Sequence, residues 1–288
     1  MKINHITPDQ EGVLASTRYR IIIPGGELAR QGHEIWVDTE PSSDADVNVW
    51  HKTGNAQSIE DLARLGGIFD VTDGHYDTEE LSDWYYNMTR TATAVTASGP
   101  WLCEFIEERT GVKAVYVPDP YEFPERPFEW RGGQSAMWFG SLPNFRSLRG
   151  VELDCPLEII TAVPEPDSKV NVKATPYSRQ AMLDGFAAHD IVILPYLTEV
   201  PRKYANNANR AINALRQGKF IVAHDIPAHR ELQDFIYIAD RILDGIEWAR
   251  AHPASAKAMV EAGQAYIRDR WSPARAAEGW RQVFERLH

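Results

Sequence analysis

The chain has 288 residues, of which 43% are hydrophobic and 25% are charged, and its net charge at pH 7 is −11. These values are typical of a globular protein with a substantial core, built as one large domain or two of ordinary size. The acidic balance argues against an extended nucleic-acid-binding surface, which would need a basic face.

The two cysteines, Cys103 and Cys155, lie far apart and show no metal-ligand spacing. We therefore expect buried thiols in a reducing compartment and no metal centre. The first residues, MKINHITPDQ, do not resemble a signal peptide, and no apolar run approaches the roughly 20 residues of a membrane span. The expected location is cytoplasmic, either free or peripheral at the inner face of a membrane.

The first half of the chain alternates short β-rich runs with amphipathic helical runs. The expected strands are KINHIT, HEIWVD, DVNVW, GIFDV, TAVTAS and KAVYV, and the expected helices lie near 17–31, 57–65, 78–91 and 100–110. Ser98 is the expected N-cap of the last of these helices, with Pro100 in its first turn. This alternation predicts a parallel α/β domain over residues 1–120.

The segment VPDPYEFPERPFEWRGG, residues 117–133, interrupts this alternation with four prolines and two adjacent glycines. Proline-rich segments form stiff, extended connectors, so we expect a hinge here.

After the hinge the alternation resumes over residues 121–271. The expected strands are SAMWFG, LEIITA, KVNVKA, DIVILPY, KFIVAHD and FIYIAD, and the expected helices lie near 177–188, 204–217, 241–251 and 254–270. In residues 272–288, Ser272 and Pro273 open a helix whose apolar face we expect to dock back on the first domain. The prediction is two Rossmann-like doubly wound domains, with ligands at the carboxyl ends of the strands and in an interdomain cleft.

Residues 202–220, RKYANNANRAINALRQGKF, combine an apolar stripe with an unusual polar face. The stripe has helical spacing and consists of Ala208, Ala211, Ile212 and Leu215. The opposite side carries amides and a guanidinium but no carboxylate, and it consists of Asn206, Asn209, Arg210 and Asn213. We expect this side to face something polar and anionic.

Several nucleotide-binding and hydrolytic motifs are absent. The first strand is not followed by G-x-G-x-x-G, and the chain contains neither a P-loop nor a G-x-S-x-G elbow. A dinucleotide-dependent oxidoreductase and a P-loop nucleotidase are therefore disfavoured.

The order of several segments resembles that of GT-B-fold glycosyltransferases of the family 4-like group. The segments are EGVLASTRYRI, LARQGHEIWV, FDVTDGHYD, the PDP of the hinge, WFGSLPNFRSL and the stretch from DIVILPY to AHREL. The likeness is closest to bacterial members that carry a K-x-x-N-R variant. Where many such enzymes have a ribose-binding glutamate of an E-x7-E motif, this chain has Asn213, and the first glutamate falls near Ala205.

The resemblance implies metal-independent transfer of a sugar, for example a hexose, from a nucleoside-diphosphate-sugar to an acceptor, without a cofactor. It implies donor-binding roles for Lys203, Asn206, Asn209, Arg210, Asn213, Gly140, Ser141 and Glu231. The loop after the first strand and the ends of the next strands add acceptor-side candidates, namely Gly12, Ser16 and Lys52. The catalytic candidates are Asp73, His51 and Arg18, with Asp73 as a general base if the enzyme inverts.

These candidates have structural alternatives. Lys203 and Arg210 suit a solvated helix face, Asp73 suits an Asx turn, and His51 suits a structural role at a strand end. Two alternative functions also remain, a sugar-nucleotide epimerase on the same fold and a non-catalytic nucleotide-sugar-binding module.

Overall fold

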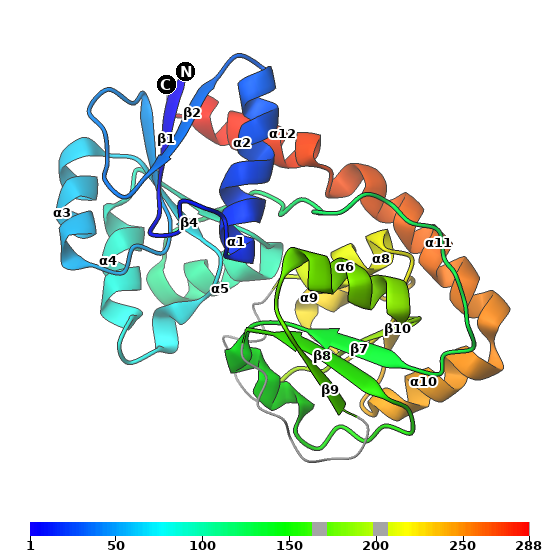
Figure 1. Cartoon of the computed structure of the whole chain (residues 1–288). Coiled ribbons are helices and arrows are strands. Elements are labelled where there is room, and N and C mark those ends of the chain that lie inside the picture. Colours follow the sequence, from blue (N-terminus) through cyan, green and yellow to red (C-terminus); the bar gives the residue numbers. More distant parts are fainter. Residues whose placement is uncertain (163–171, 198–206, 288) are drawn as a thin grey trace. The chain divides into compact units, whose positions relative to one another are not determined.

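The computed structural model describes residues 1–162, 172–197 and 207–287, which form two compact units. The first unit comprises Met1–Glu122, the short stretch that ends at Asn207, and Asp269–His288; the second comprises Phe123–Tyr204 and Ala208–Arg268. Each unit is an α/β body around one six-stranded sheet (Figure 1). The expected fold class, with two doubly wound parallel sheets, is confirmed.

The first sheet has the strand order β2-β1-β3-β4-β5-β6, and every pairing is parallel. Its strands are β1 (Lys2–Ile6), β2 (Glu34–Asp38), β3 (Val47–Trp50), β4 (Ile68–Val71), β5 (Ala94–Ala97) and β6 (Val115–Tyr116). The helical elements of this unit are α1 (Ala15–Thr17), a π-helical turn (Arg18–Ile22), α2 (Ile23–Arg30), α3 (Ala56–Leu65), a 3₁₀ turn (His75–Asp77), α4 (Ser82–Thr91), α5 (Pro100–Thr110) and α12 (Pro273–Glu285).

Both faces of the first sheet are apolar, as expected for parallel strands covered on two sides. One face packs under α3, α4 and α5 through residues such as Phe69, Met88 and Ile106. The other face packs under α2 and α12, and its core includes Trp280 and Phe284 of α12. The C-terminal helix therefore belongs to the first unit, which confirms the expectation that it docks there.

The second sheet has the strand order β12-β11-β10-β7-β8-β9, again with every pairing parallel. Its strands are β7 (Ala136–Phe139), β8 (Leu157–Thr161), β9 (Val172–Pro176), β10 (Ile191–Leu194), β11 (Phe220–Ala223) and β12 (Tyr237–Ile238). Its helical elements are a 3₁₀ segment (Leu142–Leu148), α6 (Arg179–Ala188), α8 (Asn209–Arg216), α9 (Pro227–Arg230), α10 (Ile242–Ala251) and α11 (Pro253–Arg270).

Each sheet has one point at which the strand order reverses. In the first unit this switch point lies between β1 and β3, and in the second unit it lies between β7 and β10. In doubly wound folds the connections from two such strands leave on opposite faces, and ligands bind at the carboxyl ends of the strands there. The fold thus assigns one candidate crevice to each unit.

Two expected helix starts have different outcomes. The hydroxyl of Ser272 accepts the N–H of Arg275 and Pro273 is the first helical residue, so the predicted N-cap of α12 is confirmed. The predicted N-cap Ser98 is wrong, because Gly99 occupies that position. The N–H of Ser98 still bonds to the carbonyl of Val71, and its hydroxyl accepts the side-chain amide of Asn207, so Ser98 extends the sheet instead of capping the helix.

Candidate functional site

The crevice of the second unit is formed by the residues that follow β7 and β10. Gly140 and Ser141 follow β7, Tyr196 follows β10, and Arg210 lies in the first turn of α8. A small hollow of about 10 Å³ lies here, with Asn144, Ser147, Tyr196 and Arg210 among its lining residues, and its size suits one water molecule.

Arg210 is the cation of this crevice. Its Nη1 donates to the carbonyl of Phe139 over 3.3 Å. Its guanidinium lies over the ring of Tyr196, 4.6 Å from the centroid, and 5.9 Å from that of Trp138. No carboxylate among the described residues pairs with it. Aromatic faces hold a guanidinium in place without neutralising its charge.

Gly140 leaves the backbone open beside this cation. A Cβ at Gly140 would lie 2.9 Å from Cζ2 of Trp138 and 3.3 Å from Nη1 of Arg210, so a side chain would displace the indole or the guanidinium. Ser141 is exposed, and its hydroxyl accepts the side-chain amide of Asn144 over 3.0 Å. The loop after β7 therefore offers a close approach to Arg210 that only glycine permits.

The amino end of α8 lies in the same crevice. Ala208 is its N-cap and has no side-chain oxygen that could occupy the first N–H groups, which gives this end a partial positive charge. Asn209 is half-buried in the first turn. Asn213, on the polar face expected to meet an anion, is 1% exposed and donates its amide to the carbonyl of Asn209 over 2.9 Å.

His229 lies behind Tyr196, and its ring meets the Tyr196 ring edge-on at 5.2 Å. Its Nδ1 bonds to the carbonyl of His224 over 2.9 Å. Burial, with a further contribution from the charge of Arg210, lowers the pKa of His229 to about 4. The imidazole is therefore neutral at pH 7 and does not compete with Arg210 for an anion.

Three other donor-side candidates have different positions. Glu231 is exposed and follows α9 directly. Lys203 and Asn206 lie outside the described residues, so their roles stay predictions. The roles of Tyr196, Trp138 and His229 could not be predicted from the sequence, because a ring beside a cation leaves no periodic signal.

The crevice of the first unit contains a buried ionic network centred on Arg20, in the π-helical turn. Arg20 makes a two-pronged contact with Asp70, at 3.0 Å from Nε and 2.7 Å from Nη2, and its Nη1 donates to Asp119 over 2.9 Å. Its guanidinium lies 5.1 Å from the ring centre of Trp280. Arg20 and Asp70 are each at most 2% exposed, so their charges are compensated inside the protein.

Two histidines extend this network. His51 bonds through Nδ1 to Asp70 over 3.1 Å and through Nε2 to Nδ1 of His5 over 3.0 Å. Burial alone would raise the pKa of Asp70, but the charge of Arg20 and the hydrogen bonds from His51 and Arg20 hold it well below its usual value. Burial, with the neighbouring His51, lowers the pKa of His5 well below its usual value. The catalytic candidate His51 thus has both ring nitrogens engaged.

The loop after β1 is fixed by Arg18. Its side chain bonds to Glu122 over 2.7 Å and to the carbonyl groups of Gly12 and Val13 over 2.9 and 2.7 Å. Gly12 has a φ of 74°, and a Cβ there would lie 2.2 Å from Cδ1 of Ile22. Ser16 is half-buried in α1. The catalytic candidate Arg18 therefore holds the loop that contains Gly12 and leads to Ser16, two of the acceptor-side candidates.

Lys52 and Asp73 form an ion pair between the connections that follow β3 and β4. The side chains are 32% and 43% exposed, so water reaches both groups. The structure brings these two candidates together just after neighbouring strands, each within three residues of a member of the Arg20 network.

Two properties of the described residues complete the site. No helix among them is long and apolar enough to cross a membrane. They also contain no group of three or more histidine, cysteine or acidic side chains placed to hold a metal ion.

No protein-family profile matches the sequence, and no curated protein does. Solved structures match over nearly the whole length. HepE from Anabaena, solved in complex with UDP-glucose, is 12% identical with a TM-score of 0.72, over 100% of this chain and 99% of HepE. Sucrose-phosphate synthase from Thermosynechococcus elongatus is 9% identical with a TM-score of 0.73, over 100% and 99%.

A glycosyltransferase from Rickettsia africae is 10% identical with a TM-score of 0.70, over 99% of this chain and 98% of that chain. These structures are glycosyltransferases of the GT-B fold. At such low identity the similarity establishes the fold.

Proposed function

We propose that this chain is a glycosyltransferase that moves a sugar, such as a hexose, from a nucleoside-diphosphate-sugar to an acceptor hydroxyl. The observation that carries the proposal is Arg210, a guanidinium that no described carboxylate neutralises, in the crevice between β7 and β10. A cation in that setting is suited to an anionic ligand. The binding of UDP-glucose by HepE, which has the same fold, is in keeping with this choice of donor.

Arg210 and the amino end of α8 would bind the diphosphate. When the sugar leaves, negative charge grows on the departing diphosphate, and fixed donors aimed at that charge lower the barrier. Gly140 would let the phosphates approach the backbone, and the N–H groups of α8 would add hydrogen bonds. In this proposal these protein charges, with Lys203 as a further candidate, take the place of a metal ion.

Of the predicted donor-side residues, Ser141, Asn206, Asn209 and Glu231 are proposed to contact the nucleotide or the sugar. Asn213 is proposed as a positioning residue, because its amide holds the carbonyl of Asn209 in the first turn of α8.

The acceptor is proposed to bind at the carboxyl end of the first sheet. Asp73 is the preferred general base, since it is 43% exposed, whereas His51 is buried with both ring nitrogens bonded. A base has to reach the proton that it removes, which favours the exposed carboxylate. Lys52 would orient Asp73, and Arg18 would hold the loop that contains Gly12 and Ser16.

The first test is a thermal-shift screen of the full chain with UDP, GDP, ADP, CMP and dTDP. We expect at least one diphosphate to raise the melting temperature. Arg210→Ala should weaken binding of that nucleotide by about 10- to 100-fold, the usual value of a charge-assisted contact. Arg149→Ala removes an exposed cation from the same unit and is the matched control. Binding of none of the five, or equal binding by Arg210→Ala, would contradict the donor site.

The second test follows the reaction with the corresponding nucleotide-sugar. Release of nucleoside diphosphate that depends on an added acceptor and persists in EDTA is the expected result. Conversion of the donor to another nucleotide-sugar without acceptor would indicate an epimerase, and nucleotide binding without any turnover would indicate a binding module. Either result would reject the transferase proposal.

A further inference from the structure

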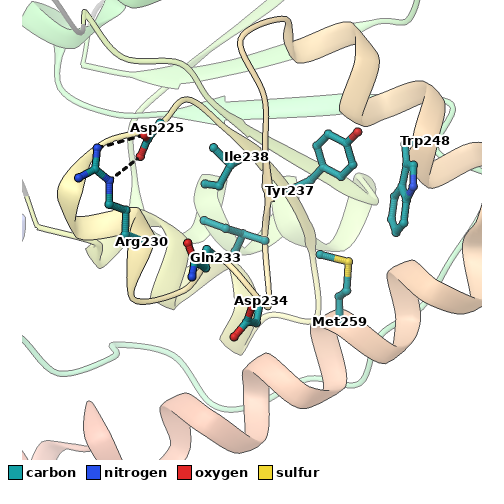
Figure 2. Close-up of a pocket in the computed structure, with 9 residues that line it drawn as sticks. Asp225, Arg230, Gln233, Asp234, Tyr237, Ile238, Trp248 and Met259 are labelled. Carbon is teal, nitrogen blue, oxygen red and sulfur yellow. Dashed lines mark hydrogen bonds and ion pairs between the residues drawn. The ribbon is translucent and has the colours of Figure 1, made fainter.

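The second unit contains a larger open hollow beside its edge strand β12. Its volume is about 550 Å³, and its walls come from β12, α10, α11, α9 and the segment around Gln233 (Figure 2). That volume lies within the range of small-molecule sites in proteins, about 300–1,000 Å³. The hollow shares no lining residue with the small hollow beside Arg210, and none of the proposed donor-site residues lines it.

The aromatic side of the hollow is held in place from behind. The Tyr237 ring lies on Gly245 of α10, where a Cβ would come within 2.8 Å of Cδ1 of Tyr237. The Trp248 ring packs against it at 5.2 Å between centroids. Because the glycine lets the tyrosine lie against the helix, this part of the wall is formed before any ligand binds, which reduces the entropy lost on binding.

The polar side of the hollow is also preformed. Asp225 and Arg230 are joined by two contacts of 3.1 Å, although each side chain is about half exposed. In Figure 2 this pair lies at one end and Trp248 at the other, with Gln233 and Tyr237 between them. Among the described residues, neither the amide of Gln233 nor the carboxylate of Asp234 has a side-chain partner.

The chemistry of these walls selects a class of ligand. Two carboxylates and one guanidinium give the lining a negative balance, which disfavours phosphates and nucleotides. The paired carboxylate and guanidinium of Asp225 and Arg230 can accept from and donate to neighbouring hydroxyl groups of a ligand. The aromatic face can pack against C–H groups of the same ligand. A neutral ring that carries hydroxyl groups on its edge and C–H groups on its faces matches both walls.

We infer that this hollow is a saccharide-binding site, separate from the donor site. Tyr237 supplies the aromatic surface, and Gln233, Asp234 and the Asp225–Arg230 pair bind hydroxyl groups. The inference goes beyond the proposed sugar transfer and does not depend on it, since neutral saccharides would bind here without nucleotide.

The test is titration of the full chain, without nucleotide, with maltotriose, cellotriose and triacetylchitotriose by calorimetry and saturation-transfer NMR. We expect at least one trisaccharide to bind, and Asp234→Ala and Tyr237→Ala each to weaken it by about 5-fold or more, the usual effect of losing one contact. Asp234 is exposed, so its variant should fold normally. Asp184→Ala, which removes an exposed carboxylate on α6, is the matched control.

Several results would overturn the inference. They are the binding of none of the three trisaccharides, binding that neither variant weakens, and tighter binding of choline, which would show a cation site instead. The Arg210→Ala variant separates the two sites: it should bind the trisaccharide normally, and Tyr237→Ala should keep the nucleotide-induced shift in melting temperature. Loss of trisaccharide binding in Arg210→Ala would place the saccharide in the donor crevice and reject the separate site.

Discussion

The two switch-point crevices occupy equivalent places in their sheets, yet they differ in electrostatics. In the first unit, Arg20 is buried between Asp70 and Asp119, so the protein supplies the opposite charge itself. In the second unit, Arg210 lies between aromatic rings without a described carboxylate. The first arginine is thus committed to the fold, whereas the second retains a charge that a ligand can satisfy. A cation near a candidate crevice is informative only once its partners are known.

The largest expected effect comes from removing the committed arginine. Arg20→Ala leaves Asp70 and Asp119 buried without their cation, and breaking a buried pair in this way costs about 3–5 kcal/mol. Urea denaturation should show this loss. Arg210→Ala is the control for the comparison and should change stability much less. A loss below about 1 kcal/mol for Arg20→Ala would contradict the structural role of the network.

The next effect is a dependence of stability on pH that belongs to the second crevice. The folded pKa of His229 is about 4, below its ordinary value of 6.5, because the neutral ring is buried. As the pH falls, the unfolded chain therefore binds this proton before the folded chain does. The contribution of His229 to the free energy of unfolding is complete above about pH 6.5. It decreases by roughly 3 kcal/mol as the pH falls to 4.

Urea denaturation between pH 7.5 and 4 measures this change. His229→Phe should flatten the curve in that window, while the wild type keeps its slope. The lowered pKa of His5 also makes stability depend on pH in this range. This effect is the same in the wild type and in His229→Phe, so it cancels when the two curves are compared. Asp70 acts in the opposite part of the range: its lowered pKa gives stability that is lost only below about pH 4. Identical curves for the two proteins would contradict the assignment to His229.

The smallest effect concerns the exposed pair of the first unit. Lys52→Ala should change the free energy of unfolding by about 0–1 kcal/mol, because water screens the contact with Asp73. In the transfer assay the same variant should raise the KM for the acceptor. The fold-change in this KM should exceed the fold-change in the dissociation constant of the nucleotide. A loss of stability comparable to that of Arg20→Ala would show that Lys52 is also structural.

The sequence predicted the architecture well because strand and helix periodicity are local. The alternation of elements located both sheets, and Ser272 with Pro273 located the start of α12. Helical spacing placed Arg210 on a polar face, but it could not show that neighbouring protein covers that face at Asn213. The N-cap at Ser98 failed because a sheet hydrogen bond from another part of the chain holds that residue.

The ionic contacts of Arg20 could not be predicted from the sequence. Arg20 contacts carboxylates 50 and 99 positions away along the chain, and such pairings have no local signature. The preformed hollow likewise depends on Gly245, whose role is visible only when Tyr237 lies against it.

The docking of α12 has a consequence for synthesis of the chain. The core of the first unit includes Trp280 and Phe284, so this unit cannot be completed until residues up to Phe284 have been translated. The core of the second unit lies between Phe123 and Arg268 and can form earlier. The later-encoded unit therefore matures first during translation, and until then the early-encoded sheet lacks the cover over Arg20 and needs protection from aggregation.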